Sequence, residues 1–405
     1  MVLGIDFTEE YIAVSLQGEE NALVFPAVIC REKKEDTWYI GEDAYRMALA
    51  GQGVITEKLL KLLFRDGTST VYHRSYTAGE LVTQLFRKVM EKAVRGTDLS
   101  GIETVCLAVH KPDAVLMDRI SGCLEQAGIP KDRQILITHE EAFVHYALSR
   151  EKDLASSMVA LFDLSGERLS YYEFMMVRGA SRKACVAEGE DLEEGFHASI
   201  LKNDSGRELG DRIMTDVARR KMEGRLFSAV LLTGAGFEQT DWAGSFLAYV
   251  CQRRRVLQEN GLFAHGAALC AEKSADGAGN EGCLIFCDSR ISSEISILIS
   301  VRERESRLVL VPAGERWYGC DLRVELLPRG QDYIDFAIEP FDSRKKKRTV
   351  RAGLSGLPVR PDRTTRIALE MSFRAADRAE VCISDMGFGE LFPSSGQRIC
   401  EEIVL

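Results

Sequence analysis

One local pattern occurs twice in this chain of 405 residues. Residues 2–16 contain an apolar run that ends at Asp6, a short polar turn and a second apolar run. Residues 158–174 repeat this order, with Asp163 in the corresponding place. Each unit predicts two strands joined by a tight turn, with a carboxylate at the end of the first strand. The repetition predicts two similar lobes whose aspartates face a shared cleft.

The segments after these units alternate between helix and strand patterns. Residues 79–94 place apolar side chains at the three- and four-residue spacing of an amphipathic helix. Residues 103–110 read as a buried strand, 113–128 as a helix that ends at a glycine, and 134–148 as a strand that runs into a helix. Residues 228–234 again read as a strand. Such alternation predicts an α/β sheet covered by helices.

The last part of the chain has a different pattern. A stretch rich in glycine and small polar residues, 273–282, predicts a boundary. Residues 322–341 alternate with a period of two around a turn that contains Gly330, and residues 365–373 and 379–386 alternate likewise. No helix is expected here, so the pattern predicts an antiparallel β-sandwich of roughly 120 residues.

Several motifs resemble those of the actin and Hsp70 ATPase superfamily, in the same order along most of the chain. The first phosphate loop of Hsp70 corresponds to GIDFTEEYIAV, and the second resembles LFDLSGERLS. The adenosine motif is similar to VLLTGAGF, and the helix entry that closes the nucleotide pocket is similar to NGLFAHGAAL. The apolar linker of Hsp70 resembles CLIFCDSR. The closing strands of its peptide-binding domain are similar in spacing to residues 353–384.

This resemblance implies a fold and a domain order. The fold expected is an α/β two-lobed actin-like domain of the Hsp70 ATPase type, with duplicated ribonuclease-H-like lobes. An all-β sandwich resembling the Hsp70 peptide-binding domain follows it. The implied divisions are lobe I at 1–157, lobe II at 158–280, and a linker with the sandwich at 281–405. Residues 177–228 are too few for the complete subdomain with which Hsp70 clamps adenine and ribose.

The resemblance also implies site residues. Lys58, in VITEKLL, matches the catalytic lysine of the family, and Glu140, in ILITHEEAF, matches the glutamate that positions the attacking water. Asp6 and Asp163 would hold a hydrated Mg²⁺, which needs only one or two carboxylates. The nucleotide, ATP or ADP, would be bound by Asp6, Thr8, Asp163, Ser165, Gly166, Arg168, Gly234, Gly236 and Gly266.

The two phosphate loops depart from the Hsp70 pattern. The first carries Glu9 and Glu10 where Hsp70 has threonines. A unit negative charge ~4 Å from a phosphate oxygen costs on the order of 1–4 kcal/mol, depending on the effective dielectric. The second loop lacks two of the three family glycines, and Arg168 stands among the replacements. Arg168 either donates to phosphate in their place or neutralises Glu9 or Glu10 across an empty cleft.

Each candidate residue also has a structural interpretation. Asp6 and Asp163 are equally well explained as turn residues kept for the fold. Glu140 as a carboxylate at a helix N-terminus is favoured over Glu140 as a base, and a solvated helix lysine is the commoner explanation for Lys58. Turns at the end of a buried strand need Gly234 in any case. The histidines at 139, 145 and 265 are expected to be packed or to lie at the cleft rim, because no nucleophile is placed with them.

The sandwich carries the expected binding surface for a protein partner. In Hsp70 the corresponding strands grip an extended peptide through backbone hydrogen bonds and side-chain pockets. Core packing between two sheets is the alternative, and it is favoured for most of the residues concerned. Because the sequence ends at Leu405, the helical lid of Hsp70 is not expected. The residues implied in peptide binding are Leu322, Val324, Leu326, Ile334 and Phe336.

Composition narrows the class of partner and compartment. The net charge of −10 argues against nucleic-acid binding, because it would repel a phosphate backbone. No apolar run reaches the length of a membrane helix and no room is left for a signal peptide, so a cytoplasmic protein without a membrane partner is expected. The eleven scattered cysteines predict reduced, buried thiols rather than a disulfide framework. Cys283 and Cys287 lack a second pair or a nearby histidine, which argues against zinc there.

Two functional hypotheses follow from these observations. The first is a divergent, chaperone-like module that binds protein through the sandwich, with a degenerate nucleotide site, little or no ATPase activity and no cofactor. The second is a working Mg-ATP-dependent chaperone of the Hsp70 type, in which Glu9 and Glu10 hold Mg²⁺ and Arg168 contacts phosphate. Glu140 would orient water and Lys58 would stabilise charge. A sugar or metabolite kinase is weaker, because the sandwich has no role in that chemistry.

Overall fold

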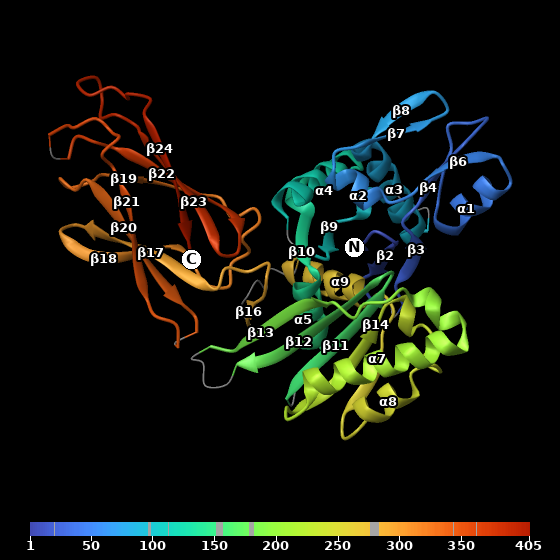
Figure 1. Cartoon of the computed structure of the whole chain (residues 1–405). Coiled ribbons are helices and arrows are strands. Elements are labelled where there is room, and N and C mark those ends of the chain that lie inside the picture. The colour runs from blue at the N-terminus through green and yellow to red at the C-terminus, as the bar shows by residue number, and fades with distance from the viewer. Residues whose placement is uncertain are drawn as a thin grey trace. The chain divides into compact units, whose positions relative to one another are not determined.

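The chain forms two compact units, Met1–Ile285 and Phe286–Leu405 (Figure 1). Most of the stretch predicted as a boundary, 273–282, lies outside the residues that the structure describes. The computed structural model describes residues 1–19, 21–95, 99–111, 113–150, 157–177, 182–275, 283–342, 344–361 and 363–405.

The first lobe of unit 1 is built on a five-stranded sheet in the order β10-β9-β1-β2-β3. Strands β1, β2 and β3 are antiparallel neighbours, whereas β9 and β10 run parallel to β1 on its other side. At the β1–β2 turn, the amide and hydroxyl of Thr8 both donate to the carbonyl of Tyr11. The strands are β1 Val2–Phe7, β2 Tyr11–Leu16, β3 Leu23–Pro26, β9 Thr104–Val109 and β10 Gln134–Thr138.

The second lobe repeats this order of strands. Its sheet runs β15-β14-β11-β12-β13-β16, with β11, β12 and β13 antiparallel and β14 and β15 parallel to β11. The extra strand β16 lies at the edge beside β13. Asp6 and Asp163 occupy equivalent places near the ends of β1 and β11. The strands are β11 Met158–Ser165, β12 Arg168–Val177, β13 Ala184–Leu192, β14 Phe227–Thr233, β15 Arg255–Gln258 and β16 Leu284–Phe286.

Both lobes also have helices at the same places in the strand order. Helix α3 begins with a capping box between Thr77 and Glu80, and α7 begins at a cap from Asn203. Apolar residues at helical spacing bury one face of α3. None of the helices in the described part of the chain has the length and apolar character needed to span a membrane. The helices are α3 Ala78–Ala93, α4 Ala114–Gln126, α5 His139–Ser149, α7 Asp204–Met222, α8 Gly244–Val250 and α9 Leu262–Ala275.

The lobes differ in what is inserted before the first of these helices. In lobe I a small subdomain lies between β3 and α3 (Figure 1). In lobe II the described residues at this point, between β13 and α7, form a single short 3-10 helix, Ala198–Lys202. No clamp subdomain is therefore present among them. The inserted elements of lobe I are β4 Ile29–Glu32, β5 Trp38–Ile40, α1 Gly41–Leu49, β6 Gly53–Thr56, α2 Leu59–Phe64, β7 Thr68–Val71 and β8 Arg74–Thr77.

The last helix of each lobe, α5 and α9, packs against strands of the other lobe. Helix α9 follows the last parallel strand of lobe II but packs on β1, β2 and β9 of lobe I, while α5 of lobe I reaches β12 and β13. Helices α5 and α9 also pack against each other, and Gly266 determines the distance between them. A Cβ built on Gly266 would lie 2.0 Å from the carbonyl oxygen of Ala142. Only glycine allows this approach, so Gly266 has a packing role at the junction of the lobes.

Unit 2 consists of two four-stranded antiparallel sheets, β18-β17-β20-β21 and β19-β22-β23-β24 (Figure 1). Its described residues contain no helix. The strands expected at either side of Gly330 are β19 and β20, and they lie in different sheets, so this connection crosses between sheets. The strands are β17 Ser293–Val301, β18 Arg304–Val311, β19 Leu322–Leu326, β20 Tyr333–Pro340, β21 Arg348–Gly353, β22 Ile367–Ala375, β23 Arg378–Asp385 and β24 Arg398–Val404.

A disulfide joins Cys382 to Cys400, so the expectation that all cysteines are reduced is wrong for this pair. The two residues are direct partners across β23 and β24, with Cα atoms 4.1 Å apart. Opposite residues in an antiparallel ladder come this close, whatever their separation in sequence. The other nine cysteines are outside this disulfide, and most are buried.

Candidate functional site

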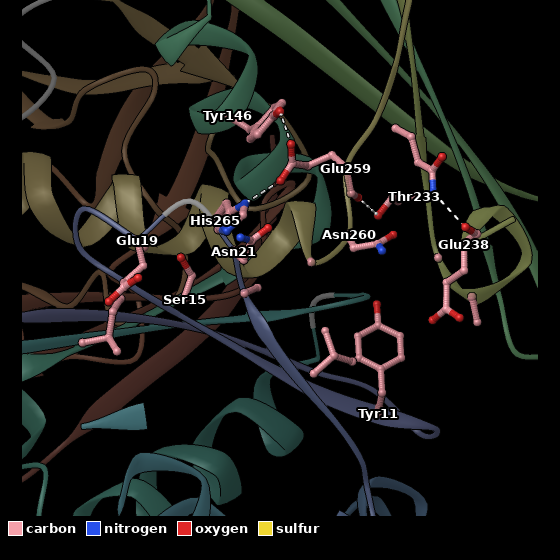
Figure 2. A pocket seen from close by; sticks show the side chains of 18 of the residues that line it. Tyr11, Ser15, Glu19, Asn21, Tyr146, Thr233, Glu238, Glu259, Asn260 and His265 are labelled. Carbon is pink, nitrogen blue, oxygen red and sulfur yellow. Dashed lines mark hydrogen bonds and ion pairs between the residues drawn. The ribbon is translucent and has the colours of Figure 1, made fainter. Parts of the chain in front are cut away.

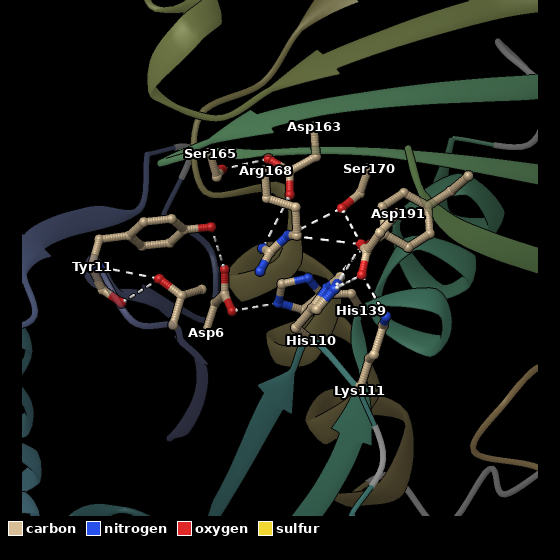
Figure 3. Close-up of polar contacts among 12 residues, drawn as sticks. Asp6, Tyr11, His110, Lys111, His139, Asp163, Ser165, Arg168, Ser170 and Asp191 are labelled. Carbon is tan, nitrogen blue, oxygen red and sulfur yellow. Dashed lines mark hydrogen bonds and ion pairs between the residues drawn. The ribbon is translucent and has the colours of Figure 1, made fainter. Parts of the chain in front are cut away.

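The two aspartates belong to one buried polar network where the lobes meet (Figure 3). Neither Asp6 nor Asp163 is exposed to solvent. Figure 3 shows side chains from β1, β2, α5 and the segment directly after β9 of the first lobe facing side chains from β11, β12 and β13 of the second. The network lies where the resemblance to Hsp70 places phosphate and Mg²⁺.

Both oxygens of Asp6 accept hydrogen bonds from protein groups. The hydroxyl of Tyr11 donates to Oδ2 at 2.9 Å, and Nε2 of His139 lies 2.8 Å from Oδ1. Burial, with the nearby charges of Asp6 and Asp163, raises the pKa of Tyr11 well above its usual value, so this phenol stays protonated. The ring of His139 stacks on Phe263 with centroids 3.8 Å apart. Asp6 is thus held by protein donors on both sides.

Asp163 is paired within its own lobe. It accepts from the hydroxyl of Ser165 and lies 3.8 Å from Nη2 of Arg168. Burial raises the pKa of Asp163 in spite of this cation. Nε of Arg168 donates to Ser170 at 3.1 Å and lies 3.9 Å from Asp191. Of the two interpretations of Arg168, pairing with Glu9 or Glu10 is not seen in the described structure, because the arginine faces Asp163 of β11 and Asp191 of β13.

Asp191 connects the two lobes. Its carboxylate accepts from Ser170 at 2.8 Å, lies 2.9 Å from Nε2 of His110 and pairs with Lys111. Although burial opposes ionisation of Asp191, hydrogen bonds from His110 and Lys111 hold its pKa far below the usual range. Burial also lowers the pKa of His110 to about 4. His110 is therefore neutral at pH 7 and donates through Nε2 while its Nδ1 lies 3.3 Å from the hydroxyl of Tyr172.

This arrangement predicts a pH-dependent stability. Because the pKa of His110 is about 4 in the folded protein and about 6.5 in an unfolded chain, the unfolded chain binds the proton first as pH falls. Neutral His110 therefore gives its full contribution to the free energy of unfolding above pH ~6.5. As pH falls from ~6.5 to ~4, the free energy of unfolding decreases by about 3 kcal/mol. His110→Gln, which does not titrate, should show a smaller loss of urea stability over this range. A variant that loses as much stability as the wild type would contradict the assignment.

The two predicted catalytic residues lie apart from the network. Glu140, at the start of α5, accepts a 2.7 Å hydrogen bond from the amide of Gly189 on β13 and is almost fully buried. Lys58 is exposed, has a left-handed backbone and precedes α2. Glu9 accepts from the amide of Lys61 at 3.0 Å, in the first turn of that helix. Glu140 thus acts as a tie between lobes, and Lys58 contacts no residue of the network in the described structure.

The turn glycines pack against the protein itself. Gly166, with φ +60°, forms the β11–β12 turn, and a Cβ there would lie within 3 Å of the Glu10 carboxylate. The turns of the two lobes therefore approach each other with Glu10 between them. Gly234, with φ +91°, lies against Asp163 and Ser165, and a Cβ on Gly236 would collide with Leu164.

A cleft of about 1420 Å³ opens between the lobes beside the network (Figure 2). Its walls include Tyr11, Gly166 and Gly234. Asp6 and Asp163 do not line it. His265 lines the rim, 2.8 Å from Glu259, which also accepts from Tyr146 of α5. The carboxylates that line this cleft are Glu10, Glu19, Glu42, Glu238, Glu259 and Glu272.

Asp6 offers no free oxygen to a hydrated Mg²⁺. A hydrated cation needs free carboxylate oxygens. Those of Asp6 are occupied by Tyr11 and His139, whereas Oδ2 of Asp163 accepts no hydrogen bond from the described residues and lies 3.8 Å from the guanidinium of Arg168. The adjoining cleft is lined by six glutamates against one arginine, Arg150, so its net negative charge repels phosphate.

The predicted peptide-binding residues lie on two facing sheets. Leu322, Val324 and Leu326 of the edge strand β19 are half-buried and pair with buried residues of β22. Ile334 of β20 is half-buried, whereas Phe336 is fully buried. Phe336 therefore belongs to the sandwich core, and the other four side chains are partly accessible.

Sequence reasoning missed Tyr11, His110 and Asp191 as members of the network. Tyr11 lies within the strand pattern of residues 2–16, and no local pattern marks Asp191. His139 was expected to be packed, which is correct, but its hydrogen bond to Asp6 spans 133 residues of sequence. A histidine at the start of the helix after a parallel strand is the one local signal that could have indicated it.

Comparison with protein families divides the chain at the same place as the structure. Residues 10–288 match a family described as "Family of unknown function (DUF5716) C-terminal". The chain belongs to the DUF5716 family. Residues 290–405 match a second description, "Domain of unknown function (DUF8552)". The DUF5716 region thus covers the two lobes and the DUF8552 region covers the sandwich. No curated protein matches the chain.

Proposed function

We propose that this DUF5716 protein is a divergent Hsp70-like module that binds protein through its sandwich and has lost nucleotide hydrolysis. The observation that carries the proposal is the position of Glu10, whose carboxylate fills the space over Gly166 between the two turns. A phosphate there would meet a negative charge at a cost of about 1–4 kcal/mol. The occupied carboxylate of Asp6 supports the same conclusion.

The shared strand order of the two lobes supports an actin-like, duplicated fold. In such a fold the turns after β1 and β11 would cradle phosphate by backbone N–H groups. Here that position is closed by side chains from both lobes, and Asp191, Glu140 and Tyr146 tie the lobes together. The unit serves as a rigid platform under this proposal.

The partner proposed for the sandwich is an extended peptide segment of another protein. Edge strand β19 has one unpaired side, and Leu322, Val324 and Leu326 are half-exposed along it. Main-chain hydrogen bonds to such an edge give affinity, and alternate side chains give specificity. The scattered, mostly buried cysteines outside the disulfide support a reducing, cytoplasmic compartment, with Cys382–Cys400 as the exception.

A thermal and urea stability titration with Mg·ATP and Mg·ADP tests the loss of nucleotide binding. A site filled at 100 times Kd would add about 2.7 kcal/mol of stability. We expect no saturable gain at millimolar nucleotide in the full chain. A saturable gain would contradict the proposal and favour a working ATPase of the Hsp70 type.

Two variants sharpen this test. Glu10→Gln removes the charge beside Gly166, so any residual affinity for nucleotide should rise. Glu42→Gln is the matched control, since Glu42 lines the same cleft but does not lie against the turn. Equal effects of the two substitutions would show that Glu10 has no special role. Binding of a labelled, extended apolar peptide to the full chain tests the partner separately, and its absence would contradict that part alone.

A further inference from the structure

A second buried cluster lies between α5 and α9, apart from the network of Asp6 and Asp163. Glu141 and His145 stand one turn apart on α5, and Cys270 faces them from α9. One ligand atom from each residue lies within 4.8 Å of the other two. Their exposed fractions are 0%, 4% and 1%. The cluster is therefore enclosed in the protein interior.

The packing of the two helices creates this cluster. Gly266 lies one turn before Cys270 on α9 and allows that helix to touch the backbone at Ala142, next to Glu141. The same close approach brings the thiol of Cys270 opposite Glu141 and His145. Glu141 and Cys270, which are 129 positions apart in sequence, thus lie close together, and no local sequence motif predicts this.

His145 gives an independent reason to expect a ligand. Neither of its ring nitrogens has a hydrogen-bond partner in the described structure. The nearest carboxylate oxygen, Oε1 of Glu141, lies 3.6 Å from Nε2, beyond hydrogen-bonding distance. A buried polar group without a partner costs free energy, and a bound cation would remove that cost for His145.

We propose that Glu141, His145 and Cys270 bind one zinc ion. A thiolate, an imidazole and a carboxylate form a ligand set that suits Zn²⁺, whereas Mg²⁺ and Ca²⁺ prefer oxygen alone. Zinc bonds of about 2.0–2.3 Å place tetrahedral ligand atoms about 3.5 Å apart. The present spacing requires the side chains to close in by about an ångström. Zinc in this position joins α5 to α9, the last helix of each lobe.

Metal analysis of the full chain tests the proposal. After expression with zinc and dialysis, we expect about one zinc per chain by elemental analysis. Cobalt added to the zinc-free protein should give a thiolate-to-cobalt charge-transfer band. Cys270→Ser should abolish the band and weaken binding by more than the about 10–100-fold that loss of an outer-shell partner costs. A full chain without stoichiometric zinc or a cobalt band would overturn the proposal.

A matched control separates metal binding from damage to the fold. Cys123 is also a buried cysteine on a helix, and Cys123→Ser should keep the zinc and the cobalt band. If Cys270→Ser fails to fold, Glu141→Gln supplies the second variant, which keeps nearly the same volume. Zinc retained at full stoichiometry in a folded Cys270→Ser or Glu141→Gln protein would overturn the assignment of ligands.

Discussion

Gly266→Ala is expected to destabilise unit 1 by more than about 3 kcal/mol, the upper end of ordinary overpacking. The new methyl group would lie 2.0 Å from the carbonyl oxygen of Ala142. A backbone oxygen in a packed helix cannot rotate away as a side chain can, so α5 and α9 would have to separate. Separation would also open the contacts of α9 with β1 of the first lobe.

Urea unfolding followed by far-ultraviolet circular dichroism measures this effect. Gly122→Ala is the matched control, because Gly122 is also inside a helix but a Cβ there has nothing within 4 Å. That control should be neutral or stabilising by up to about 1 kcal/mol, as alanine favours helix over glycine. Equal stability of the two variants would show that the closeness of α5 and α9 is not required.

Asp385→Ala should cost the sandwich about 3–5 kcal/mol, because it leaves a buried arginine without its counter-ion. The side chain of Asp385 has no solvent exposure and accepts two 2.7 Å hydrogen bonds from Arg360. The amides of Gly387 and Ser395 also donate to this carboxylate. Although burial opposes ionisation, these donors hold the pKa of Asp385 below its ordinary value. Its stabilising effect is therefore present above pH ~4 and is lost as pH falls further.

The fluorescence of Trp317, which is buried in unit 2, reports this loss during urea unfolding. Asp335→Ala is the matched control: Asp335 also pairs with an arginine through two hydrogen bonds, but Arg351 is exposed. A surface pair contributes little, so this control should unfold near the wild-type urea concentration. An Asp385→Ala protein that unfolds with the control would mean that Arg360 finds another partner or solvent.

Local patterns were sufficient for most elements of the fold. The strands expected within 2–16 occur as β1 and β2, and the helix expected at 79–94 occurs as Ala78–Ala93. Apolar spacing determines these elements because each must bury one face. The same spacing says which face of β19 or β20 is apolar but not which sheet the strand joins. The crossing at Gly330 was therefore not foreseen.

The candidate sites depend on partners distant in sequence. The sequence indicated Asp6, Asp163 and Arg168 as site residues, and all three lie in the buried network. Arg168, however, lies beside Asp191 rather than Glu9 or Glu10. That choice rests on β12 and β13 lying side by side, which only the assembled sheet determines. The bond between Cys382 and Cys400 and the cluster at Cys270 have the same origin. Pairing across strands or helices, rather than local preference, brings their side chains together.

Strand β16 has a practical consequence for dividing the chain. Leu284 donates to the carbonyl of Lys183, and β16 covers the outer side of β13. A truncated DUF5716 fragment that stops before residue 283 would leave β13 as a bare edge, open to pairing with other molecules and to aggregation. A cleavage site placed after Cys287 would keep this cover, so fragment solubility should depend on those few residues.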